Sequence, residues 1–162
     1  MTDDHQLPER SRIVQQHLIE AGVPAAVREL PDSTRTAVDA ATALGCDVGA
    51  IASSLLFLAD GEPLLVMTSG RHRVDTAVLA EQVGASVVAM ADAKRVRAVT
   101  GQAIGGVAPV GHPAPVRTVI DVALTAYEQV WTAAGTPHTV VPMTVEQLAA
   151  VTSGTQVRVA AD

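Results

Sequence analysis

The sequence predicts a single α+β domain, residues 1–162, with a central mixed β-sheet flanked by short helices. Helix-like and strand-like segments follow in the order αβαββαβα, then several strands, then αβ. This order lacks the strict βαβ alternation of a doubly wound parallel sheet. No repeat occurs at a period of about 20–50 residues. A chain of 162 residues is long enough to bury a hydrophobic core of its own, and 48% of its residues are apolar.

The chain is expected to begin with a helix and a short strand. Pro8 suits the first helical turn, and Gly22 suits the position just after the last one. Apolar residues between them recur on one broad face, as in an amphipathic helix. Residues 23–30, "VPAAVREL", then read as a strand.

A β-hairpin over residues 51–68 is the clearest local pattern. Two apolar runs flank Asp60-Gly61, a pair that favours a tight turn. A short helix over residues 36–45 precedes the hairpin. Its opening resembles a capping box, because Thr36 is followed three residues later by Asp39.

Caps and apolar runs predict the rest of the elements. They are a helix from Asp75 to Gly84, a buried strand at 86–90, a helix from Asp92 to Gly101, strands at 116–124, 128–135 and 138–143, a helix opened by a Thr144–Gln147 capping box and ending at Gly154, and a last strand at 156–160.

Composition excludes several classes of function. Only 2% of residues are aromatic, which argues against proteins that bind single-stranded nucleic acids by stacking bases on aromatic side chains. The net charge of −6 argues against sequence-independent binding to the phosphate backbone of nucleic acids. Local basic patches at 71–73 and 94–97 remain open. One cysteine excludes an internal disulfide, and scattered histidines predict no metal site. No apolar run spans a bilayer and residues 1–10 carry no leader pattern, so we predict a cytoplasmic protein.

The segment 105–115, "GGVAPVGHPAP", cannot be regular helix or a central strand. It is either a simple turn or a backbone shaped to hold a ligand. It lacks both glycine patterns of nucleotide-binding loops, so no nucleotide cofactor is expected. Gly111 and Pro113 constrain the chain on both sides of His112, which favours a displayed imidazole over an ordinary loop residue.

Four further polar residues are candidates for a site. Ser53 and Ser54 lie in the first arm of the hairpin, where one faces the core and the other faces out, unless both are merely small strand residues. Asp121 interrupts an apolar strand, so it lies at a strand end or is buried with partners. His138 is the plausible second imidazole, whereas nothing near Cys46 would activate its thiol.

A series of segments resembles the YbaK/ProX family of aminoacyl-tRNA editing domains, which are relatives of the insertion domain of bacterial prolyl-tRNA synthetases. In order, they are "TAVDAATALG", "IASSLLF", "TGQAIGGVAPVGHP", "VIDVAL", "AAGTPH" and "TVEQLAAVTSGTQV". The similarity runs from about residue 36 to residue 159. Its most specific part is 101–111, which is similar to the family loop G-x-x-x-G-G-[VI]-x-P-x-G.

The resemblance implies the family fold and an aminoacyl-tRNA deacylase that needs no cofactor. Its partner would be a misacylated tRNA, held by the 3′-terminal aminoacyl-adenosine, alone or in a synthetase–tRNA complex. Such an ester is already activated, so the work is positioning and oxyanion stabilisation. The implied catalytic residues are Ser53, Gly105, Gly106 and His112, and the implied substrate-binding residues are Thr36, Ser54, Pro109, Gly111, Asp121, Gly135, Thr136 and His138.

One position departs from the family pattern. The family has a functional lysine in I-[AV]-K-[ST]-L-[VL]-F, and this chain has Ser53 there. We expect the Ser53 side chain to face the same cavity as residues 105–112, which we call the glycine loop. The alternative function is a catalytically weakened homologue that binds an aminoacyl-adenosine-like or other small ligand. A third is a partner that acts only when docked on a synthetase–tRNA complex. The amino acid, the tRNA and the oligomeric state stay open.

Overall fold

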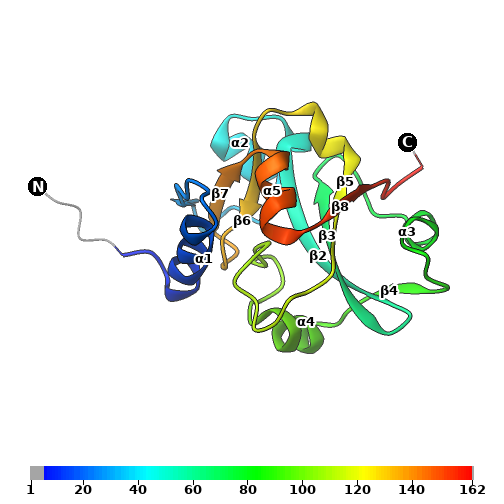
Figure 1. Ribbon diagram of the computed structural model, residues 1–162. Coiled ribbons are helices and arrows are strands. Elements are labelled where there is room, and N and C mark those ends of the chain that lie inside the picture. The colour runs from blue at the N-terminus through cyan, green and yellow to red at the C-terminus, as the bar shows by residue number, and fades with distance from the viewer. Residues whose placement is uncertain (1–5, 162) are drawn as a thin grey trace, which may run out of the picture.

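The computed structural model describes residues 6–161, in which short helices surround one β-sheet (Figure 1). The strands are β1 (Arg28–Glu29), β2 (Ile51–Ala59), β3 (Glu62–Ser69), β4 (Val88–Met90), β5 (Thr118–Asp121), β6 (Val130–Ala133), β7 (Thr139–Met143) and β8 (Thr155–Val157). The helices are α1 (Glu9–Glu20), α2 (Ala37–Leu44), α3 (Thr76–Val83), α4 (Ala93–Thr100) and α5 (Val145–Thr152), with 3₁₀ helices η1 (Val48–Ala50) and η2 (Val122–Ala126).

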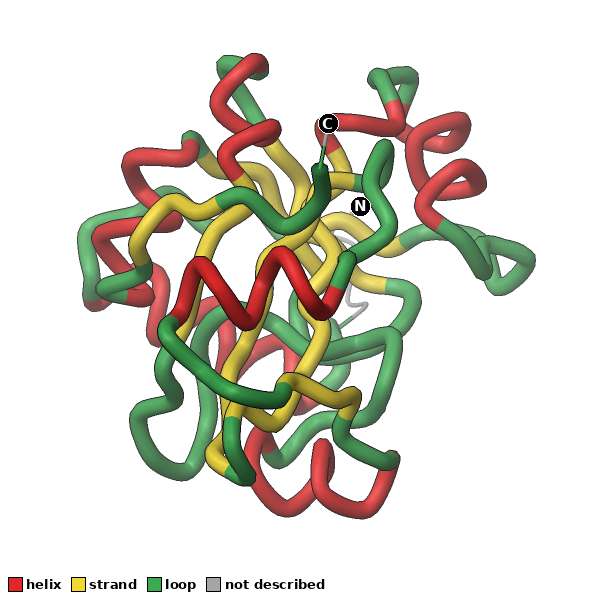
Figure 2. Tube along the Cα trace, turned by 90° about the vertical axis from the view of Figure 1, so that its right-hand side faces the viewer, coloured by secondary structure: helices red, strands yellow, loops and turns green. Residues whose placement is uncertain are grey.

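The sheet is mixed, with the strand order β1-β7-β6-β2-β3-β5-β8 and with β4 paired to β2. Three pairs, β2–β6, β3–β5 and β5–β8, are parallel, and the others are antiparallel. Figure 2 shows the strands gathered at the centre with helices and loops around them. The predicted α+β fold with a mixed central sheet is confirmed.

The predicted hairpin is confirmed as β2–β3, and it lies in the middle of the sheet. Its turn residues Asp60 and Gly61 have φ of 50° and 84°, the left-handed conformation that a tight hairpin turn requires. The Asp60 carboxylate also accepts hydrogen bonds from the main-chain N–H groups of Ser86 and Val87 at 2.9–3.1 Å. These bonds lower the pKa of Asp60 and hold the start of the next strand beside the turn.

Four helices begin at the caps that the sequence predicts: Thr36, Asp75, Asp92 and Thr144 each accept a main-chain N–H with the side chain. The capping box of α5 is complete. At α2 the Asp39 carboxylate accepts from the N–H of Arg35 instead of that of the cap residue, so this box is shifted by one residue.

Several strand boundaries differ from the predictions. The strand expected at 23–30 is reduced to β1, which pairs only with the end of β7. The strand expected to be buried at 86–90 is β4, in which only Val88 is buried. The strand expected at 116–124 stops at Asp121, whose side chain caps η2. The C-cap of α5 is Ser153, with φ of 56°, one residue before the predicted glycine.

The core is largely aliphatic and lies on both faces of the sheet. Val14 and Leu18 of α1 pack in the largest cluster, which also holds Met67 of β3. Phe57 and Leu79 belong to a second cluster, which lies beneath α3. A third, smaller cluster lies beneath α2. None of the helices in residues 6–161 is long and apolar enough to cross a membrane.

A gap in the pairing of β2 positions the candidate site. On one side, β3 pairs with β2 along residues 52–59. On the other side, β6 pairs only with Ile51 and Ala52, and β4 pairs only with residues 57–59. The Leu56 carbonyl accepts the N–H of Ala91. Residues 53–55 therefore form an open edge between two partner strands.

Candidate functional site

A pocket of about 220 Å³ lies at this open edge, and we call it the edge pocket. Four stretches of chain wall it: the approach to α2, the start of β2, the first turn of the glycine loop, and the β6–β7 hairpin. Its lining residues are Leu30, Thr34, Arg35, Thr36, Ala37, Ala40, Ile51, Ala52, Ser53, Ser54, Leu55, Ile104, Gly105, Val107, Trp131, Ala133, Pro137, Thr139 and Val140.

The edge pocket brings together Thr36, Ser53, Ser54 and Gly105 of the predicted site residues. Thr36 is there because it caps α2. Gly105 is there because a tight turn, closed by a 2.9 Å bond from the Gly106 N–H to the Ala103 carbonyl, brings the loop to the strand edge. Their parts in catalysis or binding stay predictions.

Ladder geometry directs the main-chain N–H and C=O of Ser54 to the open edge. The Ile51 carbonyl accepts from Gly70 on the β3 side, whereas the Leu56 carbonyl accepts from Ala91 on the other side. Successive strand residues direct these groups to opposite edges, so Ser54 shares the edge that Leu56 uses. Pairing with β6 stops at Ala52. The Ser54 side chain meanwhile donates to Met67 Sδ at 3.1 Å.

The glycine loop meets the β6–β7 turn at Gly106. A β-carbon placed on Gly106 would come within 2.5 Å of the Thr136 carbonyl carbon and 2.8 Å of Pro137 N. Glycine is therefore required for this close approach. On its other side the turn packs on α1, where Gly135, with φ of 102°, leaves a similarly small space against Arg10.

Hydroxyl groups tie the same turn to α1. Thr139 Oγ1 lies 2.8 Å from Thr136 Oγ1 and 2.9 Å from the fully buried Ser11 Oγ. The His138 carbonyl accepts the Leu30 N–H at 2.7 Å, and its buried Nδ1 has no hydrogen-bond partner among the described residues. Thr136, Gly135 and His138 thus support the turn, and the pocket lining from this turn is Pro137.

Gln102 braces the glycine loop from within, a role that the sequence did not reveal. Its side chain is 3% exposed. Oε1 accepts the Ala108 N–H at 2.7 Å and Nε2 donates to the Val110 carbonyl at 3.3 Å. Gly111 has a φ of 87°, and a β-carbon placed on it would lie 3.3 Å from Gln102 Nε2. A long polar residue directly after a helix-ending glycine was the available signal.

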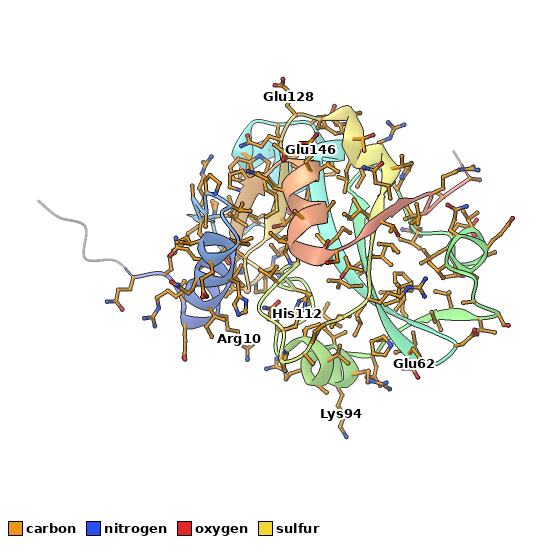
Figure 3. The ribbon with its side chains drawn as sticks, viewed as in Figure 1. Arg10, Glu62, Lys94, His112, Glu128 and Glu146 are labelled. Carbon is orange, nitrogen blue, oxygen red and sulfur yellow. The ribbon has the colours of Figure 1, made fainter. Side chains whose placement is uncertain are left out.

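His112 lines a different pocket, which we call the histidine pocket, together with Pro109, Gly111 and His17. Figure 3 shows His112 within the outline of the molecule, whereas Lys94 projects from α4. The His112 Nε2 lies 2.8 Å from the Ala108 carbonyl, so the ring closes the loop on itself. Burial lowers the pKa of His112, nearby His17 adds to this, and the hydrogen bond opposes it.

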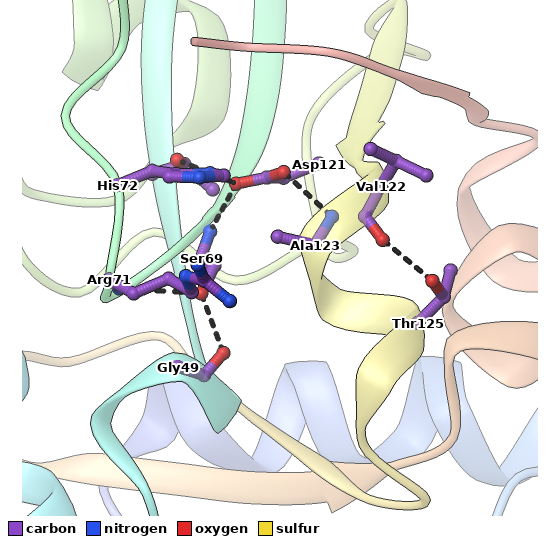
Figure 4. Close-up of polar contacts among 9 residues, drawn as sticks. Gly49, Ser69, Arg71, His72, Asp121, Val122, Ala123 and Thr125 are labelled. Carbon is purple, nitrogen blue, oxygen red and sulfur yellow. Dashed lines mark hydrogen bonds and ion pairs between the residues drawn. The ribbon is translucent and has the colours of Figure 1, made fainter. Parts of the chain in front are cut away.

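Asp121 lies apart from both pockets and is fully buried (Figure 4). Its Oδ2 accepts the Ser69 N–H at 3.0 Å and lies 2.8 Å from His72 Nδ1. Its Oδ1 accepts the Ala123 N–H at 2.9 Å. Of the two possibilities for this residue, a strand end and burial with partners, both hold, and the network fixes the end of β5 against β3.

The lining of the edge pocket is nearly uncharged. Arg35 is the one ionisable residue among the described residues that line it. Arg28 lies close by, 5.6 Å above the ring of Trp131, which also lines the pocket. Cys46 is outside the lining, and burial raises the pKa of its thiol, with Asp47 adding to the rise. The thiol is thus poorly suited to act as a nucleophile.

Comparison with known proteins identifies what kind of domain carries this pocket. The family of aminoacyl-tRNA editing domains matches residues 31–151, which hold nearly all of the pocket lining. The chain belongs to this family. The resemblance predicted from the sequence segments is confirmed.

This editing domain has relatives both within larger proteins and as separate chains. It is 32% identical over 111 residues to a proline–tRNA ligase of Bacillus licheniformis, covering 66% of this chain and 19% of the ligase. It therefore spans about a fifth of the length of such ligases. It is 28% identical to the uncharacterized protein YwhH of Bacillus subtilis, covering 75% and 78% of the two chains.

Solved structures support the same family assignment. A protein proposed to be a trans-editing enzyme for prolyl-tRNA synthetase is 38% identical, with a TM-score of 0.91, over 97% of this chain and 100% of that one. The hypothetical protein APE2540 is 26% identical, with a TM-score of 0.80, over 90% and 98%.

The chemical groups of the edge pocket suit binding and polarisation. Thr36, Ser53, Ser54 and the Gly105 turn line a small, largely apolar space, and the exposed Arg35 lies at its border. No histidine or carboxylate stands among these lining residues to activate a serine. Within residues 6–161, no three His, Cys, Asp or Glu side chains gather as metal ligands would.

Proposed function

We propose that this editing domain hydrolyses the ester of a misacylated tRNA and that the edge pocket receives the aminoacyl end. The observation that carries the proposal is the open edge of β2 facing the Gly105 turn, in a chain of this family. Water attacks the ester carbonyl, the bond to the ribose oxygen breaks, and the free amino acid and tRNA leave.

The Ser54 N–H is a suitable donor to the carbonyl oxygen as negative charge develops on it. Fixed main-chain donors of this kind contribute strongly because they need no reorganisation during the reaction. The open edge leaves this N–H without a strand partner, whereas its neighbours in β2 are paired. The glycine turn lets the ester approach from the opposite wall.

Pocket volume supports selection of a small amino acid. Sites for whole drug-sized ligands have volumes of roughly 300–1,000 Å³. The edge pocket, at about 220 Å³, suits an aminoacyl group while the adenosine stays at the mouth. Size exclusion then removes small wrong amino acids and spares larger correct ones. Because curated relatives are proline–tRNA ligases, we propose that the substrate is a tRNA for proline carrying a smaller amino acid.

A deacylation panel tests the function. The purified chain is incubated with the proline tRNA charged with alanine, serine, cysteine, threonine or proline, and the remaining ester is counted over time. We expect alanyl or seryl esters to disappear fastest and the prolyl ester to persist. Hydrolysis of none of them above the spontaneous rate, with or without added proline–tRNA ligase, would refute the proposal.

The same panel distinguishes the proposed deacylase from the alternative, a catalytically weakened homologue. That alternative is suggested by Ser53 at the position of the family lysine. A stable amide analogue of alanyl-adenosine measures binding without turnover. Binding of this analogue with no hydrolysis of any ester would favour the alternative. The net charge of −6 makes unaided tRNA capture weak, so the arm with added ligase also tests docking on a synthetase–tRNA complex.

A further inference from the structure

Arg35 stands at the mouth of the edge pocket, held there by its main chain. Its N–H donates to the Asp39 carboxylate at 3.1 Å, and the Asp39 N–H donates to Thr36 Oγ1 at 3.1 Å. These two bonds lock the residue just before the first turn of α2. The side chain is exposed, and its guanidinium makes no hydrogen bond or ion pair within residues 6–161.

Arg28, a second cation close to the edge pocket, is engaged. Among the described residues, Arg28 is the one placed over the ring of Trp131, at 5.6 Å, where the aromatic face holds it. Asp39, four residues after Arg35, is bonded to the main-chain N–H of Arg35, and Asp32, three residues before it, makes no ion pair with Arg35 in the described part of the chain. Arg35 is therefore the charge at the pocket that is free to meet an anion on a ligand.

We propose that the Arg35 guanidinium binds the phosphodiester that joins the terminal adenosine of the tRNA to the preceding nucleotide. This inference rests on the proposed function. With the aminoacyl ester in the pocket, the ribose lies at the mouth and its 5′-phosphate is the nearest negative charge of the substrate. A guanidinium matches phosphate oxygens with two parallel hydrogen bonds. Arg35 then binds the nucleotide part of the substrate, and the pocket selects the amino acid.

Two substrates separate this role from a general one. Alanyl-adenosine has the ester but no phosphodiester, whereas an alanylated CCA trinucleotide has both. We expect Arg35→Gln to raise KM for the trinucleotide by about three- to tenfold with kcat unchanged, and to leave alanyl-adenosine hydrolysis unaffected. The dependence of log(kcat/KM) on log salt should become shallower by about 0.7, the value of one single-strand phosphate contact.

Two further variants complete the experiment. Arg35→Lys keeps a point charge and should keep the salt slope with part of the affinity. Arg158→Gln removes an exposed arginine beyond β8, at the opposite edge of the sheet, and should match the wild type. Equal losses on both substrates, or a lower kcat with an unchanged salt slope, would overturn the assignment. If the wild type hydrolyses neither substrate, the proposed function has failed instead.

Discussion

At the scale of the residue, Ser53 is the position at which this domain departs from the family pattern. The hairpin register is continuous from Ala52 opposite Ser69 to Ala59 opposite Glu62. Ser53 lines the edge pocket within this unbroken register. The unbroken register agrees with the prediction that Ser53 takes the position of the lysine in the family pattern. A short neutral side chain leaves both space and electrostatic potential unfilled.

We expect Ser53→Lys to raise kcat/KM for the preferred aminoacyl-tRNA by about tenfold. An ammonium group beside the ester carbonyl stabilises developing negative charge, and one such group is typically worth roughly 10²–10³ in rate. Steady-state deacylation at fixed salt measures the effect. Ser53→Met is the control, because it adds similar length without charge. A gain by both variants, or by neither, would show that charge at this position does not limit the reaction.

At the scale of the element, the sequence correctly predicted the features that are set by residues close together in the chain. Side-chain caps such as Asp75 and Asp92 act within three residues, and the Asp60-Gly61 turn within four, so these features were predicted correctly. Strand ends depend on partners far away in sequence. Strand β1 pairs with β7 only at Thr139 and Val140, and no pattern in residues 23–30 contains that information.

The site was predicted in part for the same reason. Motif residues identified Thr36, Ser53 and the glycine turn, which do share a pocket. The separation of His112 into another pocket depends on a loop that folds back through Gln102, and this needs coordinates. The open edge depends on where two non-adjacent strands stop. Arg35 carried no signal, because an exposed arginine before a helix is ordinary.

We expect Gly106→Val to lower kcat/KM by at least about 10²-fold while the domain stays folded. The added side chain would push the glycine turn away from Thr136 and Pro137, and a displacement of about 1 Å at a site can cost this much. Overpacking should cost about 1–3 kcal/mol of stability. Circular dichroism and deacylation are measured together on each variant.

Gly154→Val provides the matched control. A β-carbon at Gly154 would come within 2.8 Å of Thr152 Oγ1 and 3.1 Å of the Thr118 carbonyl oxygen, far from the edge pocket in the order of strands. It should reduce stability comparably and keep activity. If Gly106→Val were as active as Gly154→Val, the segment would be a structural turn only.

At the scale of the whole molecule, the glycine loop links pocket geometry to global stability. His112, Gln102 and Gly111 form its internal bracing, and α1 packs behind it. Because burial lowers the pKa of His112 below its ordinary value of 6.5, the folded state resists protonation of this ring. The unfolded chain binds that proton first as the pH falls. Its contribution to stability is thus present above about pH 6.5 and is lost on acidification.

We expect the wild-type melting temperature to fall more steeply between pH 7.5 and 5.5 than that of His112→Gln. Glutamine can still donate to the Ala108 carbonyl but does not titrate. Calorimetry at several pH values gives both curves, and their difference isolates His112 from the other titrating groups. Parallel curves would mean that the ring is protonated equally in the folded and unfolded states.

Every wall of the edge pocket comes from residues 30–140 of one chain. One continuous stretch of chain therefore contributes this lining and carries it wherever the stretch is placed in a longer protein. A pocket of that kind is portable, because gene fusion or excision can join it to a larger protein or release it without rebuilding its walls. The matches to about a fifth of one relative and to 78% of another are what such portability permits.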